Sequence, residues 1–87
     1  MNRLYTIKVG PQEIRGLVSP GELPNLRSDF DWLSEYYGAS SEFNEGRMIA
    51  RKDDVEISLT VGPQHQALPG KRVLEALVKV MDSKFGS

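Results

Sequence analysis

The strongest constraint in this sequence is the strict alternation of apolar and polar residues from Val55 to Val61. Successive residues of an extended chain point to opposite faces, so this segment has one apolar face and one polar face. The apolar set is Val55, Ile57, Leu59 and Val61. A strand of this kind is typical of an antiparallel sheet that packs one face on a core and leaves the other to solvent.

Three further segments have strand character, and turn residues join them into two hairpins. Leu4–Val9 alternates in the same way, and Gly10-Pro11 separates it from the apolar segment Ile14–Val18. Met48–Arg51 precedes the alternating strand, with a turn over residues 52–54 between them. Gly-Pro and Asp-rich turns between strand segments indicate hairpins.

A first helix is predicted from about Ser28 to Tyr37. Its apolar stripe recurs at helical spacing and consists of Leu26, Phe30, Leu33 and Tyr37. Ser28 followed by Asp31 resembles a capping box, which favours a helix start at this point. Gly38 can adopt the left-handed conformation that ends many helices.

A second helix is predicted near the C-terminal end, from about Lys71 to Lys84. One side of it carries Leu74, Leu77, Val78, Met81 and Phe85, which we expect to lie in the core. Gly86 follows as a stop signal. The segments 39–46 and 62–70 are polar or rich in Gly and Pro, and we expect both to be loops.

These elements predict an α+β fold in the order β-β-α-β-β-α. A four-stranded antiparallel sheet with both helices packed on one face would bury both helical stripes. A curved, barrel-like sheet is the alternative. The repeated Val-Gly-Pro-Gln at residues 9–12 and 61–64 raises a ββα duplication as a further hypothesis, although Gly-Pro is also a general strand terminator.

The length and the lack of cysteine restrict the class of protein. A chain of 87 residues has room for one core, so residues 1–87 are predicted to be a single small domain. With 0 cysteines it has neither disulfides nor cysteine-containing metal sites, which suits a reducing compartment. There is no signal-peptide pattern and no long apolar run at the N-terminal end. We expect a soluble, cytoplasmic protein that does not enter a membrane.

The sequence has no catalytic group in a recognisable arrangement, so we expect that the chain is not an enzyme and uses no cofactor. His65 is the single histidine and lies in a loop between two glutamines. Asp29 and Asp31 lack the remaining ligands of a calcium loop, and Asp53-Asp54 suits a hairpin turn better than a metal site. Glycine-rich phosphate-binding motifs are also missing. No metal site and no catalytic residues are therefore predicted.

The first helix carries the one feature that suggests a binding surface. Trp32 and Tyr36 lie four residues apart and roughly 130° and 90° from the centre of the apolar stripe. Trp and Tyr are enriched in binding hot spots. The carboxylates of Asp29, Asp31 and Glu35 lie around them. Either these aromatic residues form a partner-binding face, or they cover a sheet edge or loop as part of a wide core.

Three functions follow in order of preference. The first is a small, non-catalytic protein-binding regulator of the inhibitor, immunity or adaptor kind, whose acidic-aromatic helix face binds a protein with a basic surface. The second is nucleic-acid binding, which the net charge of −1 disfavours. Its basic residues would be Arg47, Arg51, Lys52, Lys71, Arg72, Lys79 and Lys84. The third is a structural subunit or homo-oligomer that assembles through Trp32 and the edges of Val55–Val61.

Overall fold

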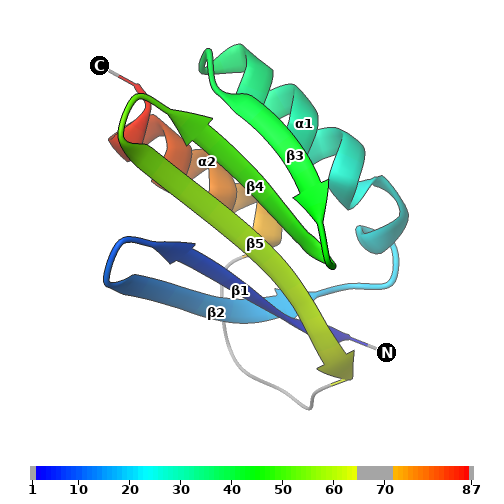
Figure 1. The fold of residues 1–87 in the computed structure, drawn as a ribbon. Helices are drawn as coiled ribbons and strands as arrows, with labels where there is room; N and C mark the ends of the chain where they lie inside the picture. Colours follow the sequence, from blue (N-terminus) through cyan, green and yellow to red (C-terminus); the bar gives the residue numbers. More distant parts are fainter. Residues whose placement is uncertain (1, 65–71, 87) are drawn as a thin grey trace.

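The computed structural model describes residues 2–64 and 72–86, which form one five-stranded sheet and two helices (Figure 1). In chain order the elements are β1 (Arg3–Val9), β2 (Gln12–Val18), a short 3₁₀ turn (Leu23–Asn25), α1 (Leu26–Tyr36), β3 (Ser40–Asn44), β4 (Arg47–Lys52), β5 (Val55–Gln64) and α2 (Val73–Lys84). All strand pairs are antiparallel, in the order β2-β1-β5-β4-β3. Both helices lie behind the sheet in Figure 1 and leave its front face open.

The predicted α+β class and the packing of both helices on one face are confirmed, but the predicted count of four strands is wrong. The additional strand is β3, which lies in the segment 39–46 that was expected to be a loop. All five of its residues are exposed, so it lacks the apolar alternation that marks a strand in a sequence. Its pairing with β4 depends on a two-residue turn at Glu45 and Gly46, both with positive φ (51° and 77°).

The strand order tests two alternatives raised by the sequence, a barrel-like sheet and a ββα duplication. Within the described residues the sheet is open, because β2 and β3 each pair on one side only, so the barrel-like alternative is not observed. A ββα duplication would make β1 equivalent to β4, and β2 equivalent to β5. The central strand of the sheet is β5, and the second half of the chain contains an additional strand, β3, that has no counterpart in the first half. The topology therefore gives the duplication no support.

The core lies between the covered face of the sheet and the two helices. Ile57 and Leu59 of β5 are fully buried there, as the alternation predicts, whereas Val55 and Val61 at the ends of the pattern are half-buried. The other fully buried large side chains are Tyr5, Ile7, Val18, Leu26, Phe30, Val73, Leu77 and Met81. On the open face, Ile49 and Ser58 are also buried, although neither of the two described helices covers them.

The ends of α1 show one wrong prediction and one confirmed prediction. The helix begins at Leu26, because the 3₁₀ turn runs directly into it, so Ser28 lies in its first turn and is not its cap. At the other end Gly38 has a φ of 76°, as predicted. Its N–H donates to the Glu35 carbonyl at 3.0 Å, and the Ala39 N–H donates to the Ser34 carbonyl at 2.8 Å. This pair of bonds is a Schellman motif.

The buried Tyr5 hydroxyl makes the stability of the fold depend on pH. Burial raises its pKa above 10.0, and the carboxylates of Glu22 and Glu75 raise it further. The unfolded chain therefore loses this proton before the folded protein does, so we expect the free energy of unfolding to fall as the pH rises from about 10 to the folded pKa. Urea denaturation between pH 9 and 11 measures this slope. The slope should be shallower in Tyr5→Phe, and equal slopes would contradict the prediction.

Candidate protein-binding surface

Trp32 and Tyr36 lie on the surface of α1, and their rings stack on each other. Trp32 is 64% exposed and Tyr36 is 69% exposed, which places both outside the core. Their ring centroids are 5.6 Å apart, with 15° between the ring planes. Tyr37 adds an edge-to-face contact with Tyr36, at 5.1 Å between centroids. Large aromatic side chains exposed in a contiguous group are characteristic of interaction sites.

The helical period explains why these aromatic side chains are exposed. Leu26, Phe30 and Leu33 are buried against the sheet and α2, as the predicted stripe requires, although Tyr37 at its end is only half-buried. Trp32 and Tyr36 are separated by one turn, so they lie one above the other on the side that faces away from that stripe. The exposed pair is thus a direct consequence of helix periodicity.

The exposed aromatic group continues onto α2 across a shallow groove. Asp29, Trp32 and Leu33 of α1 line this groove together with Leu74 and Val78 of α2, and its volume is about 210 Å³. A second hollow next to it shares Leu74 and Val78 and reaches Tyr37. We call Trp32, Tyr36, Leu74 and Val78, with the carboxylates of Asp29, Asp31 and Glu35, the aromatic face.

Leu74 and Val78 were predicted to be core residues, and for Val78 this is wrong. Val78 is 41% exposed and Leu74 is half-buried. The buried stripe of α2 consists of Val73, Ala76, Leu77, Val80 and Met81. Apolar residues therefore cover more of the circumference of α2 than the sheet and α1 can bury. This excess of apolar residues in α2 is present in the sequence, and it indicates that Val78 belongs to the candidate surface and not to the core.

The three carboxylates take different positions around the aromatic pair. Asp29 lies on the α2 side, where it lines the groove with Trp32. Asp31 lies on the β3 side, where its Oδ1 accepts a hydrogen bond of 3.0 Å from the Ser41 hydroxyl. Glu35 is exposed and follows Asp31 by one turn. The structure thus brings Asp29 next to Trp32, and it places Asp31 and Glu35 along the opposite rim.

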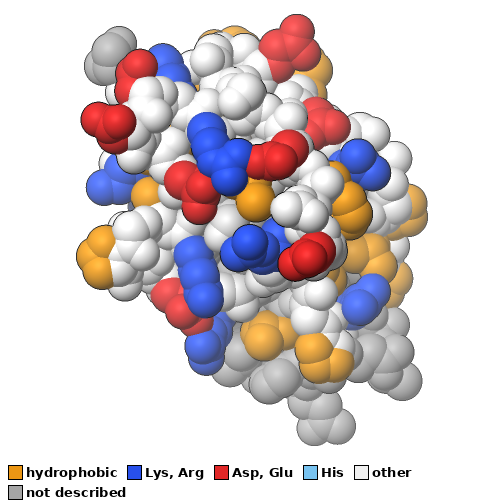
Figure 2. All heavy atoms as spheres, in the orientation of Figure 1, with side chains coloured by type: hydrophobic (Ala, Val, Ile, Leu, Met, Phe, Trp, Pro, Cys, Tyr) orange, Lys and Arg blue, Asp and Glu red, His pale blue; other side chains and the backbone are white. Residues whose placement is uncertain are grey.

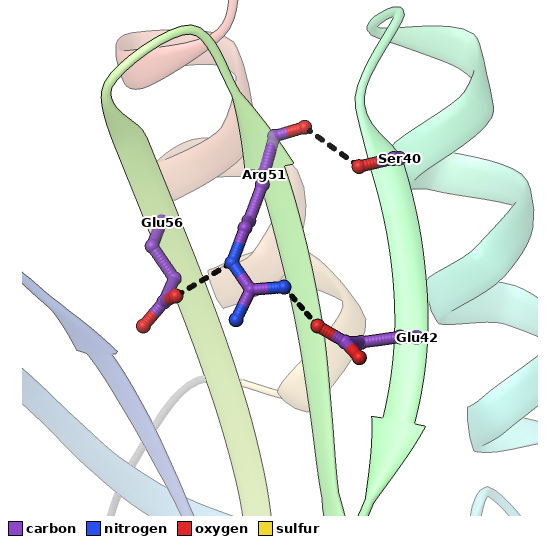
Figure 3. A network of polar contacts seen from close by, with 4 residues as sticks. All are labelled: Ser40, Glu42, Arg51 and Glu56. Carbon is purple, nitrogen blue, oxygen red and sulfur yellow. Dashed lines mark hydrogen bonds and ion pairs between the residues drawn. The ribbon is translucent and has the colours of Figure 1, made fainter.

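The basic residues proposed for nucleic-acid binding do not form a single stripe. The Arg51 guanidinium lies on the open face of the sheet between the carboxylates of Glu42 and Glu56, with which it forms ion pairs across three strands (Figure 3). Lys52 lies on the helix side, where its Nζ donates to the Phe85 carbonyl at 2.9 Å. Figure 2 shows Lys and Arg side chains interspersed with Asp and Glu over the open face. Lys71 and His65 lie outside the described residues.

The proposed assembly through the edges of Val55–Val61 is wrong as stated. This segment belongs to β5, which pairs with β1 on one side and with β4 on the other. Its backbone groups are therefore used within the sheet. Among the described strands, the edges without a partner are those of β2 and β3.

Within the described ranges, no group of three or more Asp, Glu or His side chains has a geometry that would hold a metal ion. No helix in that part of the chain is both long enough and apolar enough to cross a membrane. Comparisons of this chain with protein-family models, with curated proteins and with solved structures found no match.

Proposed function

We propose that this protein is a small, non-catalytic binding regulator of the inhibitor, immunity or adaptor kind, and that the aromatic face is its contact surface. The observation that carries this proposal is the exposure of the stacked Trp32–Tyr36 pair, 64% and 69%, in direct continuity with Val78 of α2. Trp and Tyr contribute large contact areas at a low cost in side-chain entropy, because each has only two side-chain torsions.

The chemistry of this face indicates the kind of partner. The apolar centre would enter a hydrophobic groove, and the carboxylates of Asp29, Asp31 and Glu35 at its rim would meet basic residues. Such a partner is a protein with a partly apolar groove and a basic border. The binding mechanism is occlusion, in which the face covers a surface that the partner needs for its own interactions, such as a site for a polyanion.

Replacing Trp32 with alanine should separate binding from folding. We expect the free energy of unfolding to change by less than about 1.5 kcal/mol, since the exposed ring contributes mainly its stacking on Tyr36. Binding to the partner should weaken by about 2–4 kcal/mol, the usual cost of removing a central aromatic residue of an interface. Urea denaturation and isothermal titration calorimetry measure the two quantities.

Phe43→Ala is the matched control. Phe43 is also an exposed aromatic residue (45%), but it lies on β3 with the Arg27 guanidinium over its ring at 4.5 Å, and it is not part of the aromatic face. A partner retained by immobilised wild-type protein should also be retained by Phe43→Ala and lost from Trp32→Ala. Equal retention by both variants would overturn the proposal.

The single tryptophan provides a direct test of the contact. Addition of the purified partner should shift the emission of Trp32 to shorter wavelength and protect it from iodide. If instead the emission of the protein alone shifts on concentration, together with a rise in mass by light scattering, a second copy covers the face and the chain is a self-assembling subunit.

A further inference from the structure

A second surface, distinct from the aromatic face, lies between the edge strand β2 and helix α2. Here a groove of about 420 Å³ has an apolar floor formed by Tyr5, Ile14, Ala76 and Val80. Gln12, Arg15, Lys79, Ser83 and Lys84 complete its lining. Tyr5 and Ile14 come from β1 and β2, whereas Ala76 and Val80 come from α2. The groove therefore runs along the strand, next to its free edge.

The free edge of β2 supplies unused hydrogen-bonding groups. β2 pairs with β1 over all seven of its residues, and within the described part of the chain no strand lies on its other side (Figure 1). In an antiparallel pair only alternate residues direct their N–H and C=O groups toward the partner strand. The remaining groups of β2 point outward and can pair with an added strand.

The charged side chains around the groove determine which kind of extended peptide it can bind. Lys79 and Lys84 contribute two positive charges to its lining. The Arg15 side chain alternates with Ile14 and lies on the open face of the sheet, where its Nε donates to the Glu13 carboxylate at 2.6 Å. The two lysines of α2 form no ion pair within the described residues. A net positive rim over an apolar floor suits an extended segment whose groove-facing side chains, at every second residue, are apolar over the floor and acidic next to the lysines.

We propose that this groove binds an extended acidic segment of another protein, which adds to β2 as a further strand. Main-chain bonds to the β2 edge hold the segment, and alternate apolar side chains enter the groove over Ile14 and Val80. Acidic side chains on this same face of the segment lie next to Lys79 and Lys84. Strand addition beside a helix is a general mode of peptide recognition, in which the main chain provides affinity and the groove provides specificity. The site uses none of the residues of the aromatic face.

The test uses the whole protein and end-blocked peptides of 7 residues, the length of β2. The Glu peptide has Glu, Val, Val and Glu at positions 1, 3, 5 and 7, which share one face, and Thr at the positions between them. The Lys peptide has Lys in place of both Glu residues. The proline peptide is the Glu peptide with proline at two successive positions, so that one of the two lost N–H groups faces β2 in either register. NMR titration should give saturable shifts at β2 and α2 with the Glu peptide alone. The Lys peptide fails because of charge, and the proline peptide fails because it lacks two N–H donors and cannot complete the ladder.

The variant Lys79→Glu/Lys84→Glu should bind the Glu peptide about tenfold or more weakly, because both reversed charges lie at the rim. Both lysines are exposed, and an unchanged amide spectrum would show that the variant is folded. Trp32→Ala should bind this peptide as the wild type does. A negative result for the groove can therefore be distinguished from a negative result for the aromatic face. The proposal is overturned if the peptides bind alike, if the shifts map to the aromatic face, or if β2 pairs with a second copy in the absence of peptide.

Discussion

Replacing Phe30 with alanine should destabilise this protein by about 3–5 kcal/mol, the usual cost of removing a fully buried phenylalanine ring. Phe30 has no exposed surface and packs in the core between α1 and the sheet. A domain of this length has a total stability of about 4–13 kcal/mol. The substitution therefore removes a large share of the total, and at the lower limit of this range a large fraction of the molecules would be unfolded.

Urea denaturation of Phe30→Ala measures this loss, with Phe43→Ala as the comparison. Phe43 is 45% exposed, so the same substitution there should cost less than about 1 kcal/mol. Phe30 also precedes Trp32 by two residues, and the two side chains point to opposite sides of α1. If Phe30→Ala cost less than about 1.5 kcal/mol, the described rotation of α1 would be wrong, and the exposure of Trp32 would lose its basis.

The contrast between β5 and β3 shows which strands a sequence can predict. In β5, burial of one face imposed an alternation that was recognisable without a structure. β3 is exposed over all five residues, so no burial pattern marks it. Its extended conformation is set by hydrogen bonds to β4 and by the positive φ values of Glu45 and Gly46. These are tertiary and turn effects that polar residues in a row do not reveal.

The same limit applies to the helix faces. Periodicity gave the angular position of Trp32 relative to the apolar stripe, but it did not give the width of the surface that covers α1. That width depends on how far α2 and the sheet extend around α1, which is a property of the packing. On α2 the corresponding error placed Val78 in the core, because seven of the nine residues from Val73 to Met81 are apolar and one face cannot bury them all.

The uneven charge distribution of the sequence corresponds to two surfaces of the structure. Residues 28–45 contain five acids and no Lys or Arg, and they include the carboxylates of the aromatic face. Lys79 and Lys84 belong to the more basic C-terminal part, and they line the groove beside β2. The sequence shows that acidic and basic residues are unevenly distributed along the chain. The structure adds that α2 lies between the acidic aromatic face and the basic groove, so the two groups of charges are also separate in space.

Tyr5 and Gly16 form a cross-strand pair that explains the glycine within β2. They are directly opposite in the β1–β2 register. A Cβ on Gly16 would lie 2.6 Å from the Cε2, Cζ and Oη atoms of Tyr5, well inside van der Waals contact. The tyrosine ring therefore covers the glycine, an arrangement that compensates for the missing side chain of a strand glycine. It also holds the ring in the floor of the groove beside β2.

Gly16→Ala should consequently destabilise the fold, whereas the same change at Gly62 should not. Overpacking against the buried Tyr5 ring costs about 1–3 kcal/mol. A gain of about 0.5–1 kcal/mol from the less flexible unfolded chain offsets part of it. At Gly62 of β5 the nearest contact of an added Cβ is 3.8 Å, to the Leu4 carbonyl, so only the gain applies. Urea denaturation of both variants measures the difference.

A double-mutant cycle with Tyr5→Leu assigns the loss to the ring. Leucine at position 5 removes the atoms that the new Cβ would contact, so Gly16→Ala should become neutral or stabilising in that background. The coupling free energy between positions 5 and 16 should be about 1–3 kcal/mol. A coupling near zero would mean that the ring does not lie over Gly16, and the groove would then lack the floor on which a strand-adding peptide depends.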